Sequence, residues 1–140
     1  MTYYFAATLD MSFDDAVFRV TQALKDEGFG VLTEIDVAAT LKKKINVDFR
    51  PYRILGACNP GFAHKALMAE DKIGTMLPCN VIVQQLPNGL VEVAAVDPIA
   101  SMSAVANPSL GEIAASVRSK LKAVINSLGG SGAVETGANA

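Results

Sequence analysis

The sequence predicts an α+β domain in which two long helices pack on one face of a mostly antiparallel sheet. Apolar residues recur at helical spacing over residues 13–24 and again over residues 110–128. Between these segments lie several stretches of strand length, and the last two are joined through Asn88-Gly89, the strongest short hairpin signal. A run of strands combined with two long helices is typical of the α+β class.

The first elements are predicted from aromatic content, capping residues and alternation. Residues 2–9 are rich in aromatic residues and threonine and predict a strand. Ser12 is a good N-cap for the helix that follows, and Asp15 stands three residues later, where its side chain can reach back. Gly28 offers a left-handed stop. Residues 29–36 then alternate in part between apolar and polar, which predicts a half-buried strand.

A short helix and a buried strand are predicted in the middle of the chain. Asp36 can cap a helix over residues 37–45. The stretch 53–58 shows no polar alternation after its first residue, as in a strand that is buried on both faces. Asn59-Pro60 then resembles an N-cap followed by proline at the first helical position, and it predicts another helix.

The pairing register of the hairpin at Asn88-Gly89 depends on the number of residues in its loop. If these two residues alone form the loop, Asn80 lies opposite Asp97. A longer loop would shift this register. The two strands of the hairpin span residues 79–86 and 90–96.

The length and composition are those of one folded domain. The chain has 140 residues, of which 51% are hydrophobic and 19% charged, and this excludes an intrinsically disordered protein. We expect a single domain over residues 1–128, because Gly129-Gly130 ends the last helix. We expect residues 129–140 to be disordered, since Val134 is the one large apolar residue among them.

Charge and segment patterns predict the location and exclude some partners. The formal net charge is −2, so no global basic field attracts nucleic acid or acidic lipid. The first residues lack the pattern of a signal peptide, and no window approaches the ~18 unbroken apolar residues of a membrane span. We therefore expect a cytoplasmic protein with neither nucleic acid nor a membrane as its partner.

Cys58, Cys79 and His64 are the two cysteines and the single histidine of the chain. Cys58 ends a predicted strand just before a helix start, where exposed amides and the helix dipole favour a thiolate. Two thiolates and an imidazole would suit zinc, copper(I) or haem iron, so these three residues are the candidate metal ligands. Their spacing matches no recognised motif, and two core cysteines with a surface histidine are the alternative interpretation.

Basic residues are concentrated in one part of the chain. The segment 42–72 holds seven bases and three acids (+4), and the rest holds five bases and eleven acids (−6). Within it, Arg50 and Arg53 could grip a carboxylate or phosphate through paired hydrogen bonds, with Asn59 at the following helix start completing the site. The alternative is a solvated lysine face with structural arginine pairs.

Asp97 and Asn80 complete the candidate set through the hairpin register. A carboxylate at this strand end, beside Cys79, could act as a base or a ligand, although an Asp before proline more often begins a turn. The sequence has a single histidine and no Gly-x-Ser-x-Gly segment, so no motif in it supports a hydrolase.

Several segments together resemble the DUF302 family, small proteins whose name records an unknown function. The resemblance extends over about residues 11–128. It implies a β-α-β4-α fold of the TATA-binding-protein-like type and a homodimer, and it implies no known reaction, cofactor or catalytic residue. The segments that carry it are Ser12-Phe13-Asp14-Asp15-Ala16-Val17, Glu27-Gly28-Phe29-Gly30-Val31-Leu32-Thr33-Glu34-Ile35-Asp36, Arg50-Pro51-Tyr52-Arg53-Ile54-Leu55-Gly56-Ala57-Cys58-Asn59-Pro60, Leu77-Pro78-Cys79-Asn80-Val81 and Asp97-Pro98.

These observations favour a binding module over an enzyme. In the first hypothesis, a cleft between Cys58-Asn59-Pro60 and Cys79-Asn80 binds a small anionic or metal-containing ligand, haem included. In the second, Cys58 is the reactive thiol of a redox or sulfur-transfer enzyme. In the third, the chain is an interaction scaffold that acts through its dimer surface and has no small-molecule site.

Overall fold

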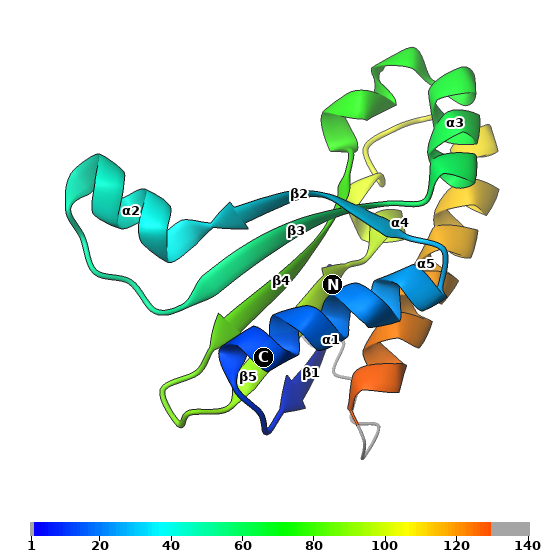
Figure 1. The fold of residues 1–140 in the computed structure, drawn as a ribbon. Helices are drawn as coiled ribbons and strands as arrows, with labels where there is room; N and C mark the ends of the chain where they lie inside the picture. The colour runs from blue at the N-terminus through cyan, green and yellow to red at the C-terminus, as the bar shows by residue number, and fades with distance from the viewer. Residues whose placement is uncertain (1, 130–140) are drawn as a thin grey trace.

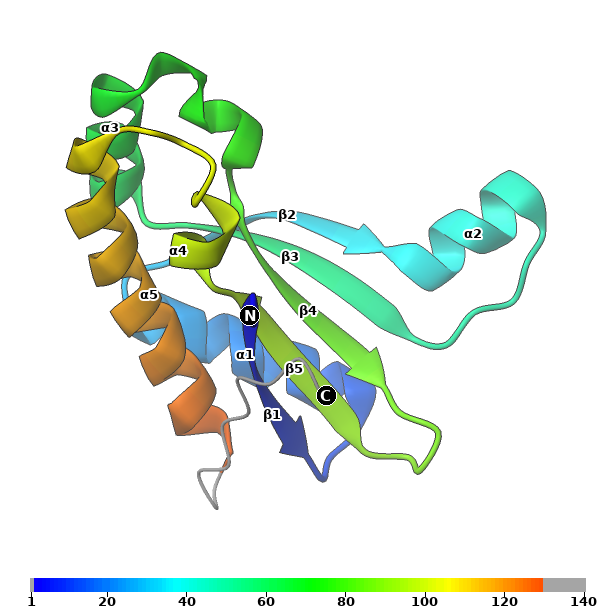
Figure 2. The same ribbon diagram turned by 180° about the vertical axis from the view of Figure 1, so that it is seen from behind.

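The structure, a computed structural model, describes residues 2–129, which form a five-stranded sheet with helices mainly on one side (Figures 1 and 2). The predicted tail 129–140 lies outside the described residues except for Gly129. The strands are β1 (Tyr4–Leu9), β2 (Gly30–Asp36), β3 (Tyr52–Cys58), β4 (Cys79–Gln85) and β5 (Val91–Val96). The helices are α1 (Phe13–Asp26), α2 (Val37–Ile45), α3 (Pro60–Ala69), the 3-10 helix η1 (Asp71–Met76), α4 (Pro98–Ser101) and α5 (Pro108–Leu128).

The sheet has the order β1-β5-β4-β3-β2, and every neighbouring pair is antiparallel. The two long helices, α1 and α5, lie side by side on one face (Figure 1). The α+β prediction, with β-α-β4-α order and both long helices on one face, is therefore confirmed. The sequence did not indicate η1 or α4.

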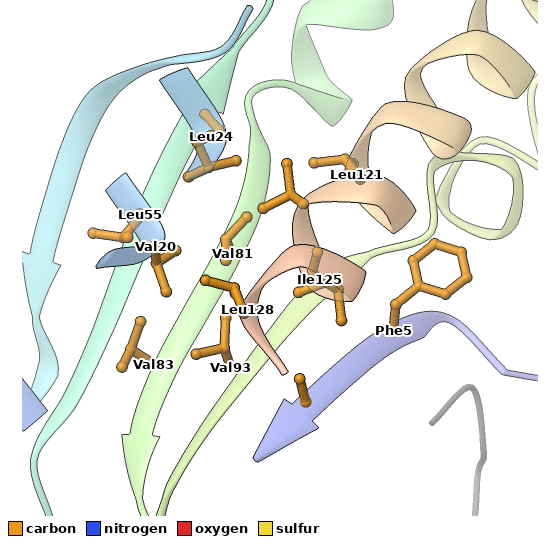
Figure 3. Packing of buried hydrophobic residues seen from close by; sticks show 14 of the residues in the cluster. Phe5, Val20, Leu24, Leu55, Val81, Val83, Val93, Leu121, Ile125 and Leu128 are labelled. Carbon is orange, nitrogen blue, oxygen red and sulfur yellow. The ribbon is translucent and has the colours of Figure 1, made fainter. Parts of the chain in front are cut away.

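The main core lies between the sheet and these two helices (Figure 3). Alternate residues of the central strands point toward the helices, as strand geometry requires, and are fully buried. They meet the apolar stripes of α1 and α5 that the sequence showed. The largest of these buried side chains include Val20, Leu24, Leu55, Val81, Val83, Val93, Leu121 and Ile125.

The predicted caps form as expected. The backbone N–H of Asp15 donates to Ser12 Oγ at 3.1 Å, and that of Ala39 donates to Asp36 Oδ1 at 2.9 Å. Gly28 adopts φ +87°, a left-handed conformation that glycine tolerates best. Local capping chemistry thus positions the helices that the sequence predicted.

The predicted hairpin register is wrong by one residue. The N–H of Leu86 donates to the carbonyl of Leu90 at 2.8 Å, and Gly89 takes φ +87°, so the loop has three residues rather than two. Val81 therefore lies opposite Ala95. This register places Asn80 level with Val96 and not with Asp97, because a shift of one residue changes every pairing.

The other face of the sheet carries no helix among residues 2–129 (Figure 2). Tyr52 and Ile54 of β3, Ile82 of β4 and Ala94 of β5 point to this open face and are half-buried. The β2–α2–β3 segment extends away from the body, and α2 buries none of its side chains (Figure 1).

Candidate functional site

An apolar cavity of about 340 Å³ lies at the end of the sheet where β3 leads into α3. The elements around it are β2, β3, β4, α3, η1, α4 and α5. Its wall contains two aromatic rings, Phe29 and Phe62, and three sulfur-bearing side chains, Cys58, Cys79 and Met102. No residue with a charged side chain lines it within the described part of the chain.

The cavity exists because two groups of buried side chains meet there without filling the space. The first is the main core, which contributes Phe29 and Cys79 to the wall. The second is a small cluster between α3, η1 and α5 that is centred on Ala66, Ile73 and Leu110. Small side chains form much of the wall between these clusters: Ala57, Ala63, Ala66, Gly74 and Ala114. A void between packed clusters forfeits dispersion contacts that a ligand would restore.

Two exposed leucines mark the opening of the cavity. Leu32 of β2 is 68% exposed and Leu67 of α3 is 44% exposed, yet both line the cavity. Leu32 is the extra residue of a β-bulge, because the pairing with β3 shifts between Val31 and Thr33. A bulge changes the direction in which a side chain points. Here Leu32 is the residue affected, and it lies at the mouth of the cavity.

Cys58 and Cys79 both line the cavity, and both are free thiols. Burial, and then the nearby Cys58, raise the pKa of Cys79 to about 11, so its thiol is uncharged at neutral pH. Cys58 is half-buried and thus more accessible. Cys79 therefore adds no charge to the cavity wall at neutral pH.

Asn59 has a structural role beside this site. Its Oδ1 accepts a hydrogen bond from the N–H of Phe62 at 3.5 Å and caps α3. Its Nδ2 approaches Gly28 so closely that a Cβ there would lie 3.1 Å away. The predicted N-cap is confirmed, and the side chain lies at the edge of the cavity.

The predicted metal ligands do not converge. Cys58 and Cys79 are neighbours, but His64 is exposed on α3 and does not line the cavity. Among residues 2–129, no three His, Cys, Asp or Glu side chains come together as a group that could hold a metal ion. The geometry thus offers two thiols without a third ligand.

The predicted anion grip is not assembled either. Arg53 stands at the start of β3, five residues or about 16 Å of strand away from Cys58. It pairs with Glu34 and, at 3.6 Å, with Asp36. Arg50 donates from Nε to Gln84 Oε1 at 2.8 Å on the open face. The two arginines are structural pairs, which was the alternative interpretation, and they do not reach Asn59.

Asp97 and Asn80 also lie apart from one another. Asp97 is buried and caps α4 through the N–H of Ile99, and its other oxygen pairs with Arg118. Asn80 is exposed and borders a hollow on the open face of the sheet. Asp97 therefore begins a turn of helix, the alternative that the sequence left open.

Of the candidate site residues from the sequence, Cys58, Asn59 and Cys79 line this cavity, and sequence reasoning missed most of its wall. The run of small residues on α3 gave a weak signal, since Ala63 and Ala66 leave space on the helix side that carries Phe62. The contributions of Met102 and Ala114 come from tertiary packing and have no local signal.

The fold and this cavity define a small α+β domain with an apolar cavity at the end of its sheet. Residues 5–128 match the family described as Domain of unknown function DUF302, and the chain belongs to that family. It is similar to a structure described as "Crystal structure of uncharacterized conserved protein DUF302 from Bacillus stearothermophilus". The identity is 30% and the TM-score 0.84, and the match covers 91% of this chain and 99% of the other.

No curated protein matches the chain. Of the helices that the structure describes, none is both long and apolar enough to cross a membrane.

Proposed function

We propose that this domain binds a small, uncharged, apolar molecule in the cavity beside Cys58 and Cys79. The observation that carries the proposal is the chemistry of the wall, which presents carbon and sulfur and, within the described residues, no charged side chain. The cavity includes Cys58, Asn59 and Cys79 of the cleft expected from the sequence, but not Pro60 or Asn80. The proposed class of ligand is apolar instead of anionic or metal-containing.

Solvation free energy explains this change of class. An anion entering the cavity would lose its hydration without gaining a cation, at a cost of several kcal/mol. An apolar molecule gains roughly 25 cal/mol for each Å² that it removes from water. Engineered apolar cavities of about 150 Å³ already bind benzene. A cavity of about 340 Å³ has room for a larger molecule, such as an eight-carbon alcohol.

Titration with matched probes tests the proposal. We expect 1-octanol to bind with a saturable heat or methyl chemical-shift change, and octanoate, zinc and haem to bind more weakly or not at all. Ala114→Leu, which places a larger side chain on the wall, should abolish octanol binding. Ala115→Leu, on the exposed side of the same helix, is the control and should retain it. Octanoate, zinc or haem binding more tightly than octanol would contradict the proposal.

We also propose that two copies of the chain associate through the open face of the sheet. This face has a hollow of about 530 Å³ whose lining includes Tyr52, Ile82 and Ala94. It also includes the polar Asn80, Gln84 and Glu92, of which Gln84 donates a hydrogen bond to Glu92 at 2.8 Å. A second copy presents the same surface, so packing of the two sheets would bury the tyrosines and isoleucines of both in an isologous interface.

Sedimentation of charge variants tests this association. Ile82→Asp places a charge in the hollow and should give monomers, whereas Ala115→Asp on α5 should leave dimers intact. Circular dichroism checks that both variants fold. A monomeric natural chain at micromolar concentration would overturn the proposal.

The redox or sulfur-transfer role left open for Cys58 has no observation in its favour beyond the accessibility of the thiol.

A further inference from the structure

We propose that Cys58 captures apolar α,β-unsaturated carbonyl compounds covalently when they occupy the cavity. This inference rests on the proposed function and adds a reaction to it. The ligand class is an uncharged 2-enal or enone with a hydrocarbon tail, which the cavity wall holds. The product is a thioether on Cys58.

Two thiols meet in this cavity, and only one of them is placed to react. Cys79 is 8% exposed, its thiol makes no hydrogen bond with any described residue, and it forms part of the inner wall. Cys58 ends β3 and is half-buried, so it is more accessible than Cys79. Both cysteines belong to the cavity lining, and Ala57, the chain neighbour of Cys58, lies opposite Cys79 in the sheet. Cys58 therefore borders the same cavity as the buried thiol.

The reaction needs no oxidant, reductant or further reactant. The Cys58 sulfur forms a bond to the β-carbon of the enal, and the carbon–carbon π bond breaks. The proton of the thiol passes through solvent to the α-carbon. The carbonyl group is retained, and no group leaves. A soft sulfur nucleophile and a soft, uncharged electrophile are the pair that this wall admits, because it excludes charged reagents.

The cavity should raise the rate of addition by holding the electrophile near Cys58. A tail held among Phe62, Ala66 and Val117 would keep the electrophile beside the sulfur and raise its effective concentration. A short electrophile such as acrolein gains nothing from the cavity because it has no tail. The rate at Cys58 should therefore depend on chain length, which is a property that ordinary surface cysteines lack.

The experiment compares (E)-2-octenal with acrolein, using peptide mapping by mass spectrometry to follow the adduct on Cys58 alone. The rate ratio of octenal to acrolein is measured in the full chain and in glutathione. We expect the ratio at Cys58 to exceed the glutathione ratio by at least about tenfold, as a modest proximity effect. Ala114→Leu should return the ratio to that of glutathione, and Ala115→Leu should keep the natural value.

A second variant keeps the test decisive if Ala114→Leu fails to fold. Gly74→Leu also narrows the cavity, and a Cβ at Gly74 meets only the Cδ2 atom of Leu67, at 4.0 Å, so this change should be tolerated. It should lower the ratio as Ala114→Leu does. A ratio equal to that of glutathione in the natural chain, or octenal adducts mainly on Cys79, would overturn the inference.

The unreactive probe 1-octanol separates the two proposals. If octanol binds and the rate ratio is unchanged from glutathione, covalent capture is wrong and the binding proposal stands. If octanol does not bind and the ratio is also unchanged, both are wrong. Octanol that competes with octenal and slows the adduct on Cys58 supports both.

Discussion

The Oδ2 atom of Asp97 lies 3.1 Å from Nε of Arg118, and this ion pair joins the start of α4 to α5. The Asp97 side chain is 10% exposed, and its Oδ1 accepts a hydrogen bond from the N–H of Ile99 at 3.0 Å. Pro98, the next residue, lines the apolar cavity. The ion pair therefore helps to hold Pro98 in the cavity wall, although neither Asp97 nor Arg118 lines the cavity.

Removing the cation should leave this carboxylate without its partner. We expect Arg118→Met to lower the free energy of unfolding by about 2 kcal/mol, because a mostly buried carboxylate loses its charged donor. Urea unfolding measures the change. The control is Lys42→Met, which removes an exposed ion pair with Asp48 and should cost under about 0.5 kcal/mol. Equal losses of unfolding free energy in the two variants would show that the Asp97 carboxylate is well solvated without Arg118.

Stability at alkaline pH should depend on Cys79. Its pKa rises from 9.0 to about 11 in the folded chain, chiefly through burial. A pKa that is higher in the folded chain contributes stability below pH 9, and this contribution is lost as the pH rises through 11.

Urea unfolding between these pH values compares the natural chain with Cys79→Val. We expect the natural chain to lose stability relative to the variant as the pH rises, because only the natural chain must bury or release a thiolate. Parallel stability curves for the two proteins would contradict the assignment of the shift to Cys79.

Gly56 should be intolerant of any side chain. A Cβ at this position would overlap Oγ1 of Thr33 and lie 2.8 Å from Cγ of Pro78. We expect Gly56→Ala to destabilise the fold by about 1–3 kcal/mol, the usual cost of overpacking. Thr33→Gly in the same chain should recover part of the loss.

The matched control for this change is Gly111 on α5, where a Cβ would meet nothing within 4 Å. Gly111→Ala should stabilise the chain by roughly 0.5–1 kcal/mol, since alanine favours helix. Thermal unfolding measures both. A neutral Gly56→Ala would mean that β2 and the segment before β4 can separate from β3.

Local chemistry made most of the fold predictable, and tertiary packing decided the rest. Ser12 and Asp36 cap helices because their short side chains reach nearby N–H groups, a relationship that the sequence shows directly. The hairpin register failed because a glycine at Gly89 permits a left-handed residue in a two-residue or a three-residue loop, and composition does not distinguish them.

The sequence indicated that Cys58 and Cys79 lie near one another, but it did not indicate the chemistry of the cavity that they line. Cys58 and Cys79 come together because β3 and β4 pair antiparallel, with Ala57 opposite Cys79. Arg53 belongs to the same strand, but at its other end, and the charge count along the chain does not reveal that separation. The bulge that places Leu32 at the mouth depends on pairing with β3, and its one sign in the sequence is that Leu32 and Thr33 break the alternation of residues 29–36.

The most direct measurement is the position of bound 1-octanol, given by intermolecular nuclear Overhauser effects in the isotope-labelled chain. We expect contacts between the octanol methylene groups and the methyl groups of Ala66, Ala114 and Val117, all of which line the cavity. Contacts confined to the open face of the sheet, at Ile82 and Ala94, would contradict the account and assign ligand binding to the opposite side of the molecule.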